Sequence, residues 1–201
     1  MTPLPPPLSS HAGIYYEQGK LEAAIAMYQK ALALEPNFPE AYNNLGNALR
    51  EAGRSEEAIA CYTACIQLQY TRAGASGGMP VVAHGRATGI APAAAQRLSV
   101  AYNNLGGILK MTGQALAAIA CYEQVVLLQP DSPEGHANLA SAYKDAARHD
   151  VAIASYRRAL ALRPDFPEAF ANFVHSLQCV CDWTERPALF ARLEQEVGFG
   201  C

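Results

Sequence analysis

The chain has 201 residues, a formal net charge of −3 and a broad hydrophobic content of 51%. This charge balance argues against a nucleic-acid-binding surface, which needs a basic patch. The sequence has neither an apolar stretch long enough for a transmembrane helix nor an amino-terminal signal pattern, so we expect a cytoplasmic or nuclear protein. The six cysteines fit no disulfide framework, which favours a reducing compartment.

Two segments of the chain are nearly the same. The first begins at Ala41 and reads AYNNLGNALREAGRSEEAIACY, and the second begins at Ala101 and reads AYNNLGGILKMTGQALAAIACY. Further along, Pro133 and Pro167 open two weaker copies that are 34 residues apart. This period, with this pattern of Ala, Tyr, Leu and Gly, is typical of the tetratricopeptide repeat (TPR), a pair of antiparallel helices. The expected fold class is all-α, a TPR superhelical solenoid.

The pattern within a repeat predicts how its two helices pack. In the second repeat Gly46 lacks a side chain, so a neighbouring helix can approach closely, and Gly53 supplies the left-handed residue that ends the first helix. Small Ala58 marks the crossing of the two helices, and Tyr62 fills the space beside it. In the fourth repeat Ala147 replaces the turn glycine, at a cost of about 1 kcal/mol if the position is left-handed.

One insertion interrupts the repeats. Pro39 and Ser99, which open consecutive repeats, lie 60 residues apart, and residues 73–98 are rich in Gly and Ala, with a helical pattern that resumes only near Ala93. We interpret these residues as a flexible segment: a tolerated insertion, a functional loop, or an unspliced or misassigned gene segment. The expected organisation is 1–8, a disordered Pro-rich start; 9–38, the first repeat with a short first helix; 39–72, the second repeat; 73–98, the insertion; 99–132, the third repeat; 133–166, the fourth repeat; 167–183, a partial fifth repeat and exit; and 184–201, an amphipathic helix and tail.

Asparagine recurs at one position of the first helix. Asn44, Asn104, Asn138 and Asn172 occupy it in four repeats, and stacked repeats would place them in a row on the concave face. A row of primary amides can pair with the backbone of an extended peptide, because each amide offers two donors and an acceptor. The alternative is that these amides are solvated or make capping and inter-repeat hydrogen bonds, and the spacing leaves both open. The expected partners are proteins or extended peptides, not nucleic acid or a membrane.

No catalytic constellation is evident in the sequence. The five histidines are scattered, and no nucleophile or phosphate-binding glycine motif is present. His175, Cys179 and Cys181 could be metal ligands, but zinc sites usually have four ligands in tighter pairs. We therefore expect no metal site and interpret the cysteines as small residues buried in helix packing.

Two stretches resemble the protein O-linked N-acetylglucosamine (O-GlcNAc) transferases. The run NFPEAYNNLG from Asn37 is similar to the repeats of that family, and the stretch from Pro164 to the exit Cys181-Asp182-Trp183 is similar to its last repeat. Such enzymes transfer N-acetylglucosamine from UDP-GlcNAc to Ser and Thr of nuclear and cytosolic proteins. The resemblance implies that the repeats recruit substrates and that the four asparagines form a ladder that holds the substrate backbone.

The catalytic region of that family, which would follow the exit helix, has no counterpart in these residues. We therefore expect the substrate- or partner-binding portion of an O-GlcNAc transferase-like enzyme, inactive alone and without a cofactor, UDP-GlcNAc being the donor of the full-length family enzyme. The alternatives are a stand-alone TPR adaptor and the repeats of a related O-fucosyltransferase of the SPINDLY type. The first helices carry few cations, namely Arg50, Lys110 and Lys144, so an adaptor that clamps a terminal carboxylate ranks lower.

Overall fold

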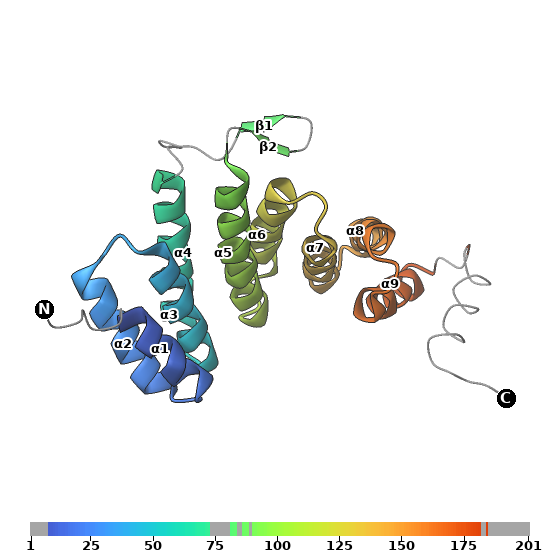
Figure 1. Cartoon of the computed structure of the whole chain (residues 1–201). Coiled ribbons are helices and arrows are strands. Elements are labelled where there is room, and N and C mark those ends of the chain that lie inside the picture. Colours follow the sequence, from blue (N-terminus) through green and yellow to red (C-terminus); the bar gives the residue numbers. More distant parts are fainter. Residues whose placement is uncertain (1–7, 73–80, 84–85, 89, 182–183, 185–201) are drawn as a thin grey trace, which may run out of the picture. The chain divides into compact units, whose positions relative to one another are not determined.

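A computed structural model describes residues 8–72, 81–83, 86–88, 90–181 and 184. Within these residues the chain forms nine α-helices and one short hairpin of two strands (Figure 1). The elements in chain order are α1 (Leu8–Glu17), α2 (Leu21–Leu34), α3 (Pro39–Glu51), α4 (Ser55–Arg72), β1 (Val81–Ala83), β2 (Arg86–Thr88), α5 (Pro92–Met111), α6 (Ala115–Leu128), α7 (Pro133–Asp145), α8 (His149–Leu162) and α9 (Pro167–Cys179). Among them no helix is long and apolar enough to cross a membrane.

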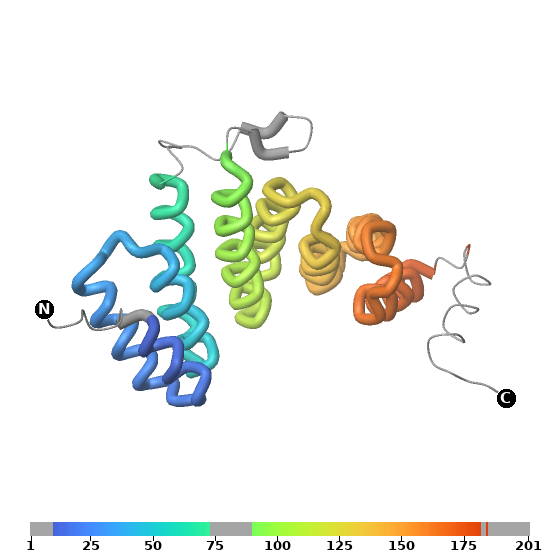
Figure 2. Tube along the Cα trace, in the orientation of Figure 1, coloured from blue at the N-terminus to red at the C-terminus, as the bar shows by residue number. Residues whose placement is uncertain are grey.

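The helices form two compact blocks, Met1–Gln129 and Pro130–Cys201. In the amino-terminal block α1 to α6 pack in chain order, each helix against the next, as the trace in Figure 2 follows. In the carboxyl-terminal block α7 pairs with α8, and α9 packs against α8. The pairs α1/α2, α3/α4, α5/α6 and α7/α8 are the first four repeats, and α9 is the first helix of the fifth, which confirms the expected all-α repeat fold.

The close approach of the two helices within a repeat depends on a glycine and a tyrosine. A Cβ added to Gly46 on α3 would lie 2.7 Å from Cε1 of Tyr62 on α4, so only glycine leaves room for the ring. Tyr62 and Ala58 are fully buried, and the tyrosine hydroxyl donates to Oδ1 of Asn47 at 2.8 Å, which satisfies its polar end. The roles predicted for Gly46 and Tyr62 are confirmed, and Ala58 is buried as a residue in helix packing.

The turns between paired helices use a left-handed residue. Gly53 and Gly113 occupy it with φ of 76° and 77°, and Ala147 occupies it with φ of 58°. At this φ the Cβ of alanine crowds the following carbonyl oxygen, whereas glycine has no such contact. The expectation that Ala147 is left-handed is confirmed, so the fourth repeat carries backbone strain that the second and third avoid.

The inserted segment is more ordered than the sequence predicted. Residues 81–83 pair antiparallel with residues 86–88, and α5 begins at Pro92, so residues 92–98 belong to a helix of the third repeat rather than to a flexible segment. Proline is favoured at the first helical position, and the three alanines that follow it are strong helix formers. At the chain ends, α1 is short and begins at Leu8, close to the expected start. The expected disorder over residues 1–7 and the expected helix over 185–201 lie outside the described residues.

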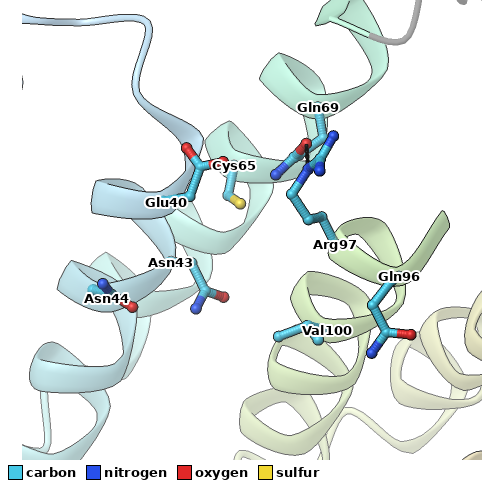
Figure 3. A pocket seen from close by; sticks show the side chains of 8 residues that line it. All are labelled: Glu40, Asn43, Asn44, Cys65, Gln69, Gln96, Arg97 and Val100. Atoms are coloured by element: carbon cyan, nitrogen blue, oxygen red, sulfur yellow. Dashed lines mark hydrogen bonds between the residues drawn. The ribbon is translucent and has the colours of Figure 1, made fainter. Parts of the chain in front are cut away.

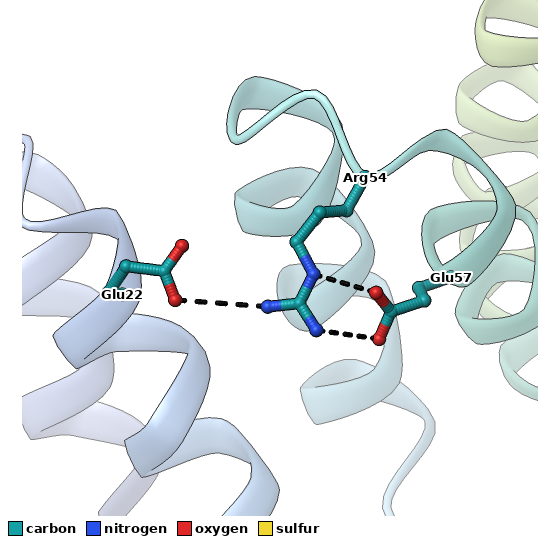
Figure 4. Close-up of polar contacts among 3 residues, drawn as sticks. All are labelled: Glu22, Arg54 and Glu57. Atoms are coloured by element: carbon teal, nitrogen blue, oxygen red, sulfur yellow. Dashed lines mark hydrogen bonds and ion pairs between the residues drawn. The ribbon is translucent and has the colours of Figure 1, made fainter.

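Side-chain contacts also join successive repeats. Arg54, in the turn between α3 and α4, makes two hydrogen bonds of 2.7 Å to the carboxylate of Glu57 (Figure 4). Its third nitrogen lies 3.8 Å from a carboxylate oxygen of Glu22 on α2. All three side chains are accessible to solvent, so the ion pairs contribute little to stability and mainly orient the turn.

Candidate functional site

The asparagines of the amino-terminal block lie on neighbouring first helices. Asn44 on α3 is exposed, whereas Asn43 on α3 and Asn104 on α5 are half-buried. Nδ2 of Asn104 donates to Oδ1 of Asn43 at 3.0 Å. The sequence predicted a row through Asn44 and Asn104, and the structure adds a hydrogen bond from Asn104 to Asn43, the residue before Asn44. The bond also shows that α3 and α5 are adjacent, although the insertion separates them in the sequence.

In the carboxyl-terminal block, Asn172 on α9 is engaged by its own block. Its Oδ1 accepts a hydrogen bond of 2.6 Å from Nζ of Lys144 on α7, and its Nδ2 donates to the backbone oxygen of Glu168 at 2.9 Å. These contacts match the alternative interpretation, in which the repeated asparagine makes inter-repeat hydrogen bonds. Asn138, on α7 with Lys144, is half-buried. One of the three cations that the sequence places on the first helices, Lys144, therefore accompanies the amides here.

A cavity of about 300 Å³ opens between α3, α4 and α5 (Figure 3). Its lining residues are Glu40, Asn43, Asn44, Cys65, Gln69, Gln96, Arg97 and Val100. Of these residues only Asn44 belongs to the contact residues predicted from the sequence. Gln96 and Arg97 belong to the first turns of α5, which the repeat pattern assigned to the insertion, so periodicity alone could not have found them.

Hydrogen bonds and one ion pair arrange the cavity walls. Nε of Arg97 donates to Oε1 of Gln69 at 3.1 Å, across the gap between α5 and α4. Glu40 on the opposite wall lies 3.4 Å from Nη1 of Arg72, whose Nη2 donates to the backbone oxygen of Asn37 at 2.9 Å. Arg97 is thus held by a contact between the third and second repeats, and Glu40 by an ion pair within the second repeat.

Aromatic and thiol groups complete the packing of α4 against its neighbours. The hydroxyls of Tyr70 on α4 and Tyr102 on α5 lie 3.2 Å apart, and the two rings pack edge to face with their centroids 6.4 Å apart. Burial raises the pKa of Tyr102, and its bond to Tyr70 raises it further, so the Tyr102 hydroxyl stays protonated near neutral pH. Burial likewise raises the pKa of the Cys65 thiol to about 12, which makes it an unreactive wall of the cavity.

The cysteines divide into two kinds. Cys65 and Cys121 are buried in helix packing and Cys61 is half-buried, as the sequence predicted. The prediction is wrong for Cys179 and Cys181, which are exposed because α9 ends there. Nε2 of His175 lies 3.7 Å from Sγ of Cys179. In the part of the chain that the structure describes, no three His, Cys, Asp or Glu side chains lie close enough together to hold a metal ion.

Stacked helix pairs with a polar face on their first helices define a repeat scaffold for protein interaction. Four family models match the chain, and all describe the tetratricopeptide repeat, over residues 13–53, 39–69, 99–132 and 136–169. The chain therefore belongs to the tetratricopeptide repeat proteins, whose members bind peptides or proteins.

Two curated relatives are glycosyltransferases by name. The chain is 31% identical over 133 residues to the human protein O-mannosyl-transferase TMTC1, an alignment that covers 64% of this chain and 12% of that protein. It is 40% identical over 53 residues to the probable UDP-N-acetylglucosamine–peptide N-acetylglucosaminyltransferase SEC of Arabidopsis thaliana, covering 26% of this chain and 5% of that protein. The chain thus spans only a small part of the length of either relative.

Similar solved structures are general TPR proteins. A MamA structure has a TM-score of 0.73 and 20% identity, covering 94% of this chain and 88% of that chain. A MamA fragment from Desulfovibrio magneticus RS-1 has a TM-score of 0.73 and 18% identity, covering 96% of both chains. YrrB, described as a TPR protein with an unusual peptide-binding site, has a TM-score of 0.69 and 16% identity, covering 94% of this chain and 84% of that chain. At these identities the likeness concerns the fold alone.

Proposed function

We propose that the chain binds extended segments of partner proteins on the first-helix face of its repeats. The contact residues that we propose are Asn44, Asn104, Asn138 and Asn172, with Asn43 as an addition from the structure. The observation that carries the proposal is the hydrogen bond from Asn104 to Asn43 beside the exposed amide of Asn44.

The hydrogen-bonding capacity of these amides suits a peptide backbone. The bond from Asn104 to Asn43 engages one Nδ2 and one Oδ1, and it leaves the Nδ2 of Asn43 and the Oδ1 of Asn104 for a ligand. The exposed amide of Asn44 adds donors and an acceptor. An extended backbone alternates N–H and C=O groups, so a surface that offers both donors and acceptors matches it without selecting a side chain.

The carboxyl-terminal block also supports peptide binding, and here an ammonium group accompanies the amides. Nζ of Lys144 uses one hydrogen for Asn172, and an ammonium group has three, so two remain to donate. Peptide carbonyl oxygens would accept from this ammonium group. In this block we propose Lys144 as a contact residue together with Asn138 and Asn172.

A triple substitution tests the proposal. We would select binders from a displayed library of random peptides of about twelve residues, long enough at roughly 3.4 Å per residue to cross more than one repeat. The selected peptides should lose at least about tenfold in affinity when Asn104, Asn138 and Asn172 are all changed to Ala, because several hydrogen bonds of about 1 kcal/mol each disappear. The helical circular dichroism signal should persist.

Asn37→Ala is the matched control. Asn37 is an exposed amide in the turn before α3, and the contact that fixes this residue uses its backbone oxygen. This variant should bind the selected peptides like the wild type. If the triple variant instead melts with a collapse of its helical signal, the repeated asparagines are structural and the proposed contact surface is wrong.

At a finer level, we propose that the bound segments are substrates of a protein glycosyltransferase of which these repeats are a part. Both curated relatives carry the name of an enzyme that attaches a sugar to proteins. The similarity of the repeats and of the Cys181-Asp182-Trp183 exit to O-GlcNAc transferases favours UDP-GlcNAc as the donor of the full-length enzyme, and the cytoplasm or the nucleus as its location.

A stand-alone adaptor is the second candidate function, since the structural neighbours are general TPR proteins. Sequencing of the transcript beyond codon 201 separates the two. A reading frame that continues into a nucleotide-sugar-binding region supports the glycosyltransferase. A stop codon there overturns it and leaves the adaptor, while peptide binding by the repeats stands in either case.

A further inference from the structure

We propose that the cavity between α3, α4 and α5 receives an acidic side chain, Asp or Glu, of the bound peptide, and that Arg97 holds its carboxylate. This inference rests on the proposed peptide binding and adds a side-chain preference to it. The amides of the first helices recognise a backbone that all peptides share, whereas a charged cavity beside them can select among sequences.

Donor groups dominate the part of the cavity that a ligand can reach. Oδ1 of Asn43 accepts from Asn104, and Oε1 of Gln69 accepts from Nε of Arg97. Each amide therefore has its oxygen engaged and its NH₂ group left to donate. Arg97 is exposed and uses Nε for Gln69, so both of its terminal nitrogens remain for a ligand. A carboxylate accepts from such a fork through two parallel hydrogen bonds.

The charges around the cavity favour an anion. Glu40 is the one acidic residue among those that line it, and Arg72 lies 3.4 Å from that carboxylate and offsets its charge. Arg97 has no acidic partner among the described residues; its contact is the neutral amide of Gln69. The local balance is therefore positive, and an acidic ligand side chain supplies the missing counter-charge.

The cavity is large enough and is partly apolar. Its volume of about 300 Å³ holds several water molecules and is enough for a glutamate side chain. Val100, which is 44% exposed, and the buried Cys65 line it beside the polar groups and can contact the methylene part of such a side chain. In Figure 3 the side chains of Gln69 and Arg97 meet at one end of the space that separates Asn43 and Asn44 from Val100.

The insertion is what creates this site. The positions equivalent to Arg97 in the neighbouring repeats are Asn37, Asp131 and Asp165, and all three lie in turns before a first helix. In the third repeat the helix starts early, at Pro92, so the same position is helical and faces α4. The insertion thus gives the third repeat a cation where the other repeats carry an amide or a carboxylate.

The test compares the sequences that the wild type and three Arg97 variants select from the random peptide library described above. The wild type should enrich Asp and Glu, and changing the selected acidic residue to its amide should weaken binding about tenfold. Arg97→Gln should select peptides without this enrichment, and Arg97→Glu should enrich Lys and Arg instead. Arg97→Lys should retain a weaker acidic preference, because the charge remains and the fork is lost.

Arg54→Gln is the matched control because it also removes one arginine charge, but far from the cavity. Arg54 precedes the amino end of α4, and Gln69, which Arg97 contacts, lies near its carboxyl end, roughly 20 Å away at a rise of about 1.5 Å per residue. It should select like the wild type. Binding without acidic enrichment by the wild type, or enrichment that persists in Arg97→Gln, overturns this inference and leaves peptide binding intact. If the wild type selects no binders at all, the proposed function fails together with it.

Discussion

Asn104 and Asn43 are joined by a hydrogen bond of 3.0 Å between two first helices that the insertion separates in the sequence. The bond spans successive repeats, so we expect it to couple them. A double-mutant cycle with Asn43→Ala and Asn104→Ala should give a coupling of about 0.5–1.5 kcal/mol in the free energy of unfolding, measured with urea. Purely additive effects of the two substitutions would show that the bond does not form in solution.

Gly46→Ala should destabilise the second repeat. The new Cβ would lie 2.7 Å from Cε1 of Tyr62, and the buried ring cannot move away without disturbing its bond to Asn47. The expected loss is about 1–3 kcal/mol in the free energy of unfolding. Gly107→Ala is the control: its Cβ would meet the hydroxyl of Tyr122 at 3.8 Å, an ordinary contact, so it should be neutral or stabilising by up to about 1 kcal/mol. Equal effects of the two substitutions would contradict the packing described.

Ala147→Gly should stabilise the protein. Ala147 has φ of 58°, a conformation that costs alanine about 1 kcal/mol relative to glycine. The gain should appear as a rise in the urea midpoint of the carboxyl-terminal block, without a change in the slope of the transition. Gly113→Ala provides the reverse experiment, because φ there is 77° and a Cβ would meet no atom within 4 Å, so it should lose a similar amount through the backbone alone. A destabilised Ala147→Gly variant would argue against strain at the turn.

The cysteines should react with iodoacetamide in an order set by exposure and pKa. Burial raises the pKa of Cys65 to about 12 and that of Cys121 to about 11, so at pH 8 almost no thiolate is available at either position. Cys179 and Cys181 are exposed. Mass spectrometry of digested native protein should find the latter pair modified first, and in urea the buried cysteines should react as well. Rapid native modification of Cys65 would contradict its burial.

The buried thiol of Cys65 predicts how the free energy of unfolding changes at alkaline pH. The pKa of Cys65 in the folded state lies above its ordinary value of 9.0, so in the alkaline range the unfolded state loses the proton first. The contribution of this thiol to stability is therefore intact below pH 9 and is lost as pH rises through about 12. Urea midpoints measured from pH 8 upwards should fall above pH 9, and Cys65→Ala should reduce the slope of that fall.

The sequence by itself determined the helices of each repeat and how they pack against each other. The helix pairs, the glycine facing a tyrosine and the left-handed turn at Ala147 each follow from residues within one repeat, so they can be predicted from a single sequence. The resemblance to O-GlcNAc transferases likewise depends on short local runs. Such features depend on contacts between residues close in sequence, where helix geometry fixes which side chains meet.

The tertiary structure decided which groups meet between repeats. Periodicity aligned Asn44 with Asn104, whereas the hydrogen bond of Asn104 goes to Asn43. The tertiary structure also places Arg97 against α4. The packing of α4 against α5 sets the direction of α5, and the additional turns of α5 continue in that direction. Contacts between distant positions depend on the angle and the offset at which whole helices pack, and these result from the side chains of an entire interface rather than from any short motif.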